Sequence, residues 1–243
     1  MLFASSLLRA DDSPVIAAAA SLKFALQDIA KAFHQDSGKT VRISYSSSGN
    51  LTRQILQGGP FQLFLSANDN YVEQLFQQQK TQDHGVVFAL GRLVLLSRKN
   101  SSLLLDEQLE DIKQALLEGR LKRFAIANPE HAPYGIAARE VLQSLALWPL
   151  IKPHIVLGEN VAQATQFTSS GAAQAGLVSY SLALAPVLQS STRSLLISTT
   201  LHQPLKQTMV LLNNAGDTAK LFFNYLQQDK ALNILSRYGY SAP

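Results

Sequence analysis

The sequence predicts an α/β protein built as two doubly wound lobes that are joined by two hinge strands. Short apolar runs alternate with segments of helical periodicity along the whole chain. Strands that alternate with helices favour parallel sheets covered by helices on both faces. The length of 243 residues, with 47% hydrophobic and 16% charged residues, allows two lobes with packed cores and argues against disorder.

The first 80 residues predict three strand–helix units. The helix after the first strand carries Leu26 and Ile29 on one apolar face and ends at Gly38. Strands are expected at residues 15–19, 41–45 and 63–65, and helices at 21–38, around 51–55 and around 71–76.

A longer strand is expected at residues 90–97, and a second set of strand–helix units follows it. Helices are expected at residues 106–118, 136–147 and 161–168, and strands at 124–127, 154–157 and 176–180. The chain then ends with a strand at 206–213 and helices at 218–228 and 231–238. We expect residues 1–92 and 208–243 to form one lobe and residues 93–207 the other, with crossings near Leu93 and Thr208.

The composition argues against several classes of function. The chain has no cysteine, so disulfides, thiolate metal sites and cysteine nucleophiles are excluded. The net charge is only +4 and the basic residues are scattered, which argues against a nucleic-acid partner. The five histidines lack metal-ligand spacing, and no glycine-rich nucleotide motif is present. We therefore expect neither an enzyme nor a resident cofactor or metal.

The N-terminus resembles the end of a secretory signal. Residues 1–10 are apolar and rich in small residues, and residues 11–14 turn polar. No apolar run approaches the roughly 18 residues that a membrane span needs. We interpret residues 1–14 as an incomplete signal remnant, which predicts a secreted protein; an ordinary frayed N-terminus is the alternative.

Three places share one local design, in which a strand ends and small or hydroxyl residues open a helix. They are residues 17–22 (AAAASL), 46–51 (SSSGNL) and 133–136 (PYGI), and residues 158–161 (GENV) have the same placement. The first N–H groups of a helix lack partners within the helix and lie at the positive end of its dipole. Several helix starts aimed at one point would bind an anion without a fixed positive charge.

Each of these places also has a simpler interpretation. Ser21 and Ser48 could be ordinary helix caps, residues 46–49 a flexible linker, and residues 133–135 a turn. The repetition of the design in both halves of the chain favours a shared anion site.

Together, these stretches resemble the periplasmic molybdate-binding proteins of ABC importers. The matching stretches are AAAASL at 17–22, SSSGNLTRQI at 46–55, LFLSA at 63–67, NPEHAPYG at 128–135, ENV at 159–161 and RYGY at 237–240. The likeness runs from about Val15 to the C-terminus. It implies a type II periplasmic-binding-protein fold that captures molybdate or tungstate between its lobes.

The resemblance implies roles for four residues. Ser21 and Ser48 match the serines that hold the anion in this family. Tyr134 would contribute mainly its backbone N–H, and Val161 opens a later helix at the site. The metal would be bound only as the oxyanion, through these residues, and no cofactor is implied.

The position of a fifth contact is open. Many members of the family use a tyrosine hydroxyl near the end of the strand that matches residues 176–180. Ungapped counting from Val161 places this contact at Ser179, one step before Tyr180. Because one step along a strand reverses the side-chain face, Ser179 would supply a shorter donor or none.

The resemblance further implies a periplasmic monomer that delivers the oxyanion to the membrane permease of an ABC importer. A carrier for sulfate or another tetrahedral oxyanion is the nearest alternative. A sensor domain of a transcription regulator would need a helix-turn-helix segment, and none precedes Val15. An enzyme on the same fold, such as a porphobilinogen deaminase, would need a cysteine to tether its cofactor.

Overall fold

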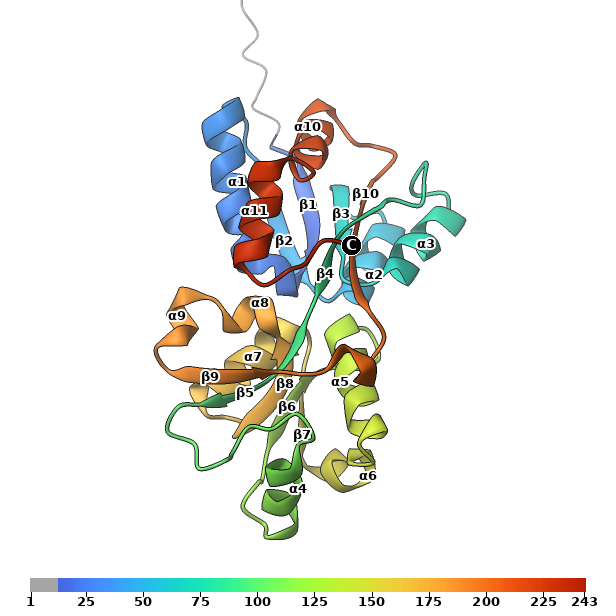
Figure 1. Ribbon diagram of the computed structural model, residues 1–243. Coiled ribbons are helices and arrows are strands. Elements are labelled where there is room, and N and C mark those ends of the chain that lie inside the picture. Colours follow the sequence, from blue (N-terminus) through green and yellow to red (C-terminus); the bar gives the residue numbers. More distant parts are fainter. Residues whose placement is uncertain (1–12) are drawn as a thin grey trace, which may run out of the picture.

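In the computed structural model, residues 13–243 form two lobes, each built on a five-stranded mixed sheet flanked by helices (Figure 1). The strand order is β2-β1-β3-β10-β4 in the first sheet and β7-β6-β8-β5-β9 in the second. This is the two-lobed α/β class that the sequence predicts. Most of the expected signal remnant, residues 1–12, lies outside the described residues.

The first sheet combines both ends of the chain. β1 (Val15–Ala19) runs parallel to β2 (Arg42–Ser46) and β3 (Phe61–Ser66), whereas β10 (Leu205–Leu211) runs antiparallel to β3 and to β4 (Val86–Gly91). The helical segments of this lobe are η1 (Ala20–Leu22), α1 (Lys23–Ser37), α2 (Ser48–Leu56), α3 (Asp69–Gln77), α10 (Asp217–Tyr225) and α11 (Asp229–Arg237).

The alternation of side chains along β1 builds a core on each face of this sheet. Ala17 packs in one apolar cluster with residues of α2 and α3, and Ile16 packs in the other with residues of α1, α10 and α11. Figure 1 shows these two groups of helices on opposite sides of the sheet. As predicted, α1 ends at Gly38, which has a φ of 69° that favours glycine.

The second sheet comes from the middle of the chain. β6 (Phe124–Ala127) runs parallel to β7 (Ile155–Gly158) and β8 (Ala175–Ser179), and β5 (Leu93–Arg98) runs antiparallel to β8 and pairs with β9 (Thr192–Leu196). The helical segments of this lobe are α4 (Glu110–Leu117), α5 (Pro133–Ser144), α6 (Trp148–Ile151), η2 (Lys152–His154), α7 (Val161–Ser170), α8 (Tyr180–Ala183), α9 (Pro186–Gln189) and η3 (Thr199–Leu201).

The first crossing between the lobes corrects one expectation. The single strand expected at residues 90–97 is wrong, because β4 and β5 belong to different sheets and Arg92 separates them. Gly91 and Leu93 on either side of the break are both buried, and the apolar run continues through it and hides it. The second crossing follows Gln203, which still bonds to Glu140 of the second lobe, and residues 205–207 already pair with β4 in the first sheet, ahead of the expected boundary at 208.

No helix within residues 13–243 combines the length and apolarity that crossing a membrane requires. The chain end returns to the first crossing, where Ser241 forms a β-bridge with Leu90 of β4. The C-terminal residues therefore lie beside the strand that connects the lobes.

Candidate functional site

A small cavity lies between the lobes, where β1 and β2 end and where α2, α5 and α7 begin. Its water-accessible volume is about 10 Å³, which is roughly the space of one water molecule. The first lobe contributes the strand ends and the start of α2, and the second contributes two further helix starts. The lining residues are Ala19, Ala20, Ser21, Ser46, Ser47, Ser48, Ala67, Ala132, Pro133, Tyr134, Asn160 and Val161.

Four of the residues singled out from the sequence line this one cavity. Ser21 and Ser48 come from the first lobe, and Tyr134 and Val161 come from the second. Each is between 0% and 4% exposed. The structure thus brings together residues that are up to 140 positions apart in the sequence, as the shared-site interpretation requires.

Three helices begin at the cavity, where the first N–H groups of a helix lack acceptors within the helix. Ser48 and Val161 are the first residues of α2 and α7, and Tyr134 is the second residue of α5 after Pro133, which has no N–H. In α7 the cap side chain of Asn160 accepts from the N–H groups of Ala162 and Gln163. Capping therefore occupies the next amides of α7 and leaves the Val161 amide without an acceptor inside the helix.

The two predicted serine hydroxyls are placed as donors. The Ser21 Oγ atom is buried and has no hydrogen-bond partner among the described residues. Leaving such a group unpaired costs about 1–3 kcal/mol. The Ser48 Oγ accepts from the Ala67 N–H at 3.0 Å, so its own proton remains available to donate. An acceptor inside the cavity would satisfy both hydroxyls.

The cavity carries no formal charge of its own. In the described part of the chain, no lysine, arginine, histidine, aspartate or glutamate lines it. The same residues contain no group of three or more histidine, cysteine or carboxylate side chains that could hold a metal ion. The cavity therefore offers neutral hydrogen-bond donors and the positive ends of helix dipoles, which is the chemistry of an anion site.

Neither candidate for the fifth contact is among the residues that line the cavity. The Ser179 Oγ lies 2.5 Å from the Ser181 Oγ, and Ser181 in turn donates to the Ser21 carbonyl at 2.7 Å. Tyr180 begins α8, and its ring lies so close to Gly239 that a Cβ there would be 2.4 Å from it. The Ser179 hydroxyl therefore contacts Ser181 of α8, which bonds to the Ser21 carbonyl, and Ser179 does not line the cavity.

The Tyr134 hydroxyl lies against the first crossing between the lobes. A Cβ on Gly91 would lie 2.2 Å from the Tyr134 hydroxyl, so glycine is needed for this close approach. Burial raises the pKa of Tyr134 to about 12, although the nearby hydroxyls of Ser179, Ser21 and Tyr240 partly oppose the shift. None of these neighbours meets full hydrogen-bond geometry with it, so the hydroxyl is buried without a fixed partner.

Sequence reasoning missed other residues near the site. Ser47 caps α2 and also contacts His131 of the second lobe, with 2.9 Å between Oγ and Nδ1. Asn160 caps α7 and lines the cavity. Both follow a strand and precede a helix, so the general preference of serine and asparagine for helix caps could have found them.

Two α/β lobes that enclose an uncharged cavity of donors define a two-lobed anion-binding protein of the periplasmic-binding-protein fold. The sequence matches the bacterial extracellular solute-binding protein family over residues 14–241. The chain belongs to this family of binding proteins.

Individual relatives agree with this assignment. The molybdate-binding protein ModA of Rhodobacter capsulatus is 33% identical over 229 residues, which are 93% of this chain and 87% of that protein. ModA of Escherichia coli is 31% identical over 242 residues, or 96% of this chain and 90% of that one. The solved structure of the Azotobacter vinelandii periplasmic molybdate-binding protein has a TM-score of 0.86 and 28% identity, and the match covers 95% of this chain and 100% of that chain.

The raised pKa of Tyr134 predicts a specific alkaline instability. The folded protein keeps this phenol protonated to about pH 12, whereas an unfolded tyrosine ionises near 10.0. Its contribution to stability is therefore complete below pH 10 and is lost as the pH rises toward 12. In Tyr134→Phe, the fall in unfolding free energy over this range should be smaller by roughly 2–3 kcal/mol. Urea titrations at several pH values measure it, and parallel curves for the two proteins would contradict the burial argument.

Proposed function

We propose that this protein captures molybdate or tungstate in the periplasm and delivers it to the membrane permease of an ABC importer. The observation that carries the proposal is the uncharged cavity in which the buried Ser21 hydroxyl lacks a partner. The relatives that are named molybdate-binding proteins support the same ligand class. We further propose that the protein acts as a monomer, without a cofactor and without a nucleic-acid partner.

In the proposed mechanism, neutral donors replace the water around a doubly negative oxyanion. Burying an ion is costly unless its hydration is replaced, and charge-assisted hydrogen bonds of about 1.5–3 kcal/mol each offset that cost when several converge. Ser21 and Ser48 supply hydroxyls, and the amides of Tyr134 and Val161 supply N–H groups. Ser179 acts only behind the cavity, through Ser181 and the Ser21 carbonyl.

A cavity that offers only hydrogen-bond donors also discriminates among oxyanions. Hydrogen phosphate carries a proton that needs an acceptor, and the described lining contains no carboxylate to receive it. Sulfate has no proton at neutral pH and is instead disfavoured by its smaller size, because it cannot reach every donor at once. Molybdate and tungstate are larger and nearly alike, so both should bind.

Contacts beside the cavity hold the lobes together. The Gly49 N–H donates to the His131 carbonyl across the cleft at 2.9 Å. The Ser47 Oγ accepts from the Asn50 N–H and lies 2.9 Å from His131 Nδ1, and His131 Nε2 faces Glu159 at 3.6 Å. Because donors come from both lobes, only closure completes the shell around the anion, and ligand binding favours the closed form that the permease would recognise.

The remaining alternatives are less well supported. A sulfate carrier would share the fold, so only measured affinities for sulfate and molybdate distinguish it from a molybdate carrier. The family consists of solute-binding proteins rather than enzymes. A catalytic role for the Ser47–His131–Glu159 group is disfavoured, because Ser47 is only 3% exposed and its hydroxyl caps α2.

Calorimetry with four oxyanions tests the proposed function directly. Molybdate and tungstate should bind tightly, and phosphate should bind more weakly by roughly 10³-fold or more, because its proton would have no partner. Sulfate should lie between them. Tight phosphate binding without molybdate binding would overturn the assignment, and a preference for sulfate would make the protein a sulfate carrier.

The two serine hydroxyls should each contribute to affinity. Ser21→Ala and Ser48→Ala each remove one charge-assisted hydrogen bond, so the Kd for molybdate should rise by roughly 10- to 100-fold. Ser21→Ala should not lower the melting temperature of the ligand-free protein, because the lost hydroxyl has no partner there. Ser194→Ala, on an exposed position of β9, is the matched control. Unchanged affinity in either cavity variant would leave that serine a structural residue only.

Gly49 should control closure. A Cβ at this position would lie 2.8 Å from the His131 carbonyl oxygen of the other lobe, which is too close. Within α2 itself, alanine is tolerated, because it is a better helix former than glycine. Gly49→Ala should therefore keep its fold but close incompletely, and its Kd should rise by roughly 5- to 100-fold. Small-angle scattering with saturating molybdate should give a larger radius of gyration than the wild type. Gly216→Ala, where the nearest atom is 3.3 Å away, should behave like the wild type, and equal compaction of Gly49→Ala would contradict the closure contact.

A further inference from the structure

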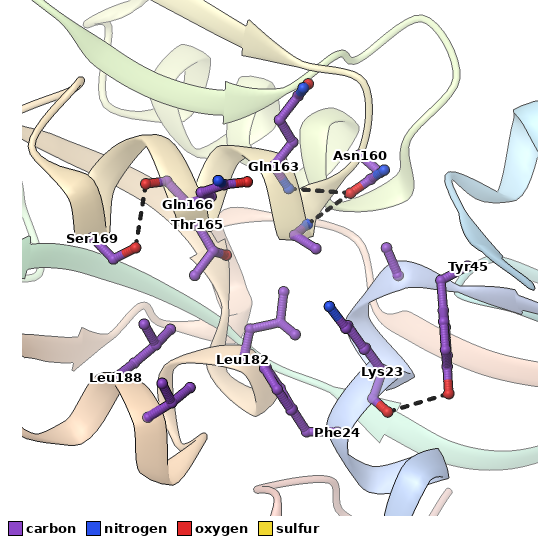
Figure 2. Close-up of a pocket in the computed structure, with 13 residues that line it drawn as sticks. Lys23, Phe24, Tyr45, Asn160, Gln163, Thr165, Gln166, Ser169, Leu182 and Leu188 are labelled. Atoms are coloured by element: carbon purple, nitrogen blue, oxygen red, sulfur yellow. Dashed lines mark hydrogen bonds between the residues drawn. The ribbon is translucent and has the colours of Figure 1, made fainter.

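An open cleft of about 620 Å³ lies next to the anion cavity (Figure 2). The two share Ala20 and Asn160, so the cleft reaches the edge of the cavity. The first lobe lines it with Lys23, Phe24 and Tyr45, and the second lobe lines it with the start of α7 and with residues of α8 and α9. An anion that enters the cavity from this side must pass through the cleft.

Lys23 is the one charged residue among the described residues that line this cleft. Figure 2 shows its ammonium group pointing into the open space between the lobes. No ion pair within residues 13–243 involves Lys23, and its ammonium instead lies 5.6 Å from the centre of the Phe24 ring. No carboxylate of the described chain lines the cleft, so nothing in its wall neutralises this charge.

Helix stability does not explain a lysine at this place. Lys23 follows η1 without a break and opens α1, and the first turns of both segments contain no acidic residue. A cation near the start of a helix is disfavoured by the helix dipole, which favours anions there. Residues whose charge is unfavourable for the local secondary structure are more common at functional sites than elsewhere.

We propose that Lys23 is a capture residue that draws the doubly negative oxyanion into the cleft before it enters the neutral cavity. This inference rests on the proposed function. Charge in a cleft between low-dielectric walls attracts a ligand over a long range and raises its association rate. Because Lys23 does not line the cavity, the bound anion is held by neutral donors and its dissociation rate does not depend on this charge.

Separating capture by Lys23 from binding by the neutral donors has a chemical advantage. A lysine attracts sulfate, phosphate and molybdate alike, because Coulombic attraction depends on charge and not on the proton or the size of the ion. Inside the cavity such a charge would weaken the discrimination that the neutral donors provide. In the cleft it concentrates every anion, and the cavity then selects among them.

Stopped-flow fluorescence with molybdate tests the inference on the full chain. Lys23→Gln should associate roughly 3- to 10-fold more slowly at low ionic strength, and its dissociation rate should stay within about twofold of the wild type. The difference should vanish near 1 M salt, where the Debye length falls to about 3 Å. Lys23→Arg keeps the charge and should associate as fast as the wild type.

Lys220→Gln is the matched control, because it removes the same charge from an exposed position on α10, away from the cleft. It should associate as fast as the wild type. Equal association rates for the two glutamine variants would overturn the inference, as would a change confined to the dissociation rate. A slow Lys23→Arg variant would show that charge is not the cause. If the wild type itself does not bind molybdate, the proposed function fails first and the inference falls with it.

Discussion

The convergence of unpaired helix N–H groups and serine hydroxyls on one cavity is the constraint on which the rest of the structure depends. Parallel strands end at one edge of a sheet, so β1 and β2 bring Ser21 and Ser48 side by side. The second lobe supplies its donors in the same way, after β6 and β7. Small residues are required where the chain turns into these helices: a Cβ on Gly135 would lie 2.2 Å from the Ala127 carbonyl oxygen.

The same elements couple the cavity to the relative position of the lobes. The Ser21 carbonyl accepts from Ser181 of the second lobe, and Ser181 accepts in turn from the Tyr240 hydroxyl at 3.1 Å. The segment that carries the Ser21 donor is therefore also a contact between the lobes. If Ser21 holds the ligand as proposed, this contact links the ligand to the relative position of the lobes.

Much of the fold and most of the cavity could be predicted from local patterns. β1 and β6 have the expected bounds, because short apolar runs between turns are distinctive, and Gly38 marks the end of α1. β9 (TRSLL) was not predicted, since it is only partly buried and lacks an apolar run. The break at Arg92 was hidden by burial on both sides. The Ser47–His131 contact joins residues 84 positions apart, and the special position of Lys23 depends on which side chains face it, so neither has a local signal.

The direction of the Ser48 hydroxyl donor is set before any ligand arrives. The Ser48 Oγ already accepts from the Ala67 N–H, and this leaves its proton as the group that must find an acceptor. The amides at the helix starts are fixed by the backbone and cannot turn away. A rigid set of donors loses little conformational entropy on binding and needs little reorganisation, so more of each hydrogen bond contributes to affinity. The same rigidity disfavours a ligand that brings a donor of its own, because the backbone N–H groups cannot become acceptors and no carboxylate in the described chain lines the cavity.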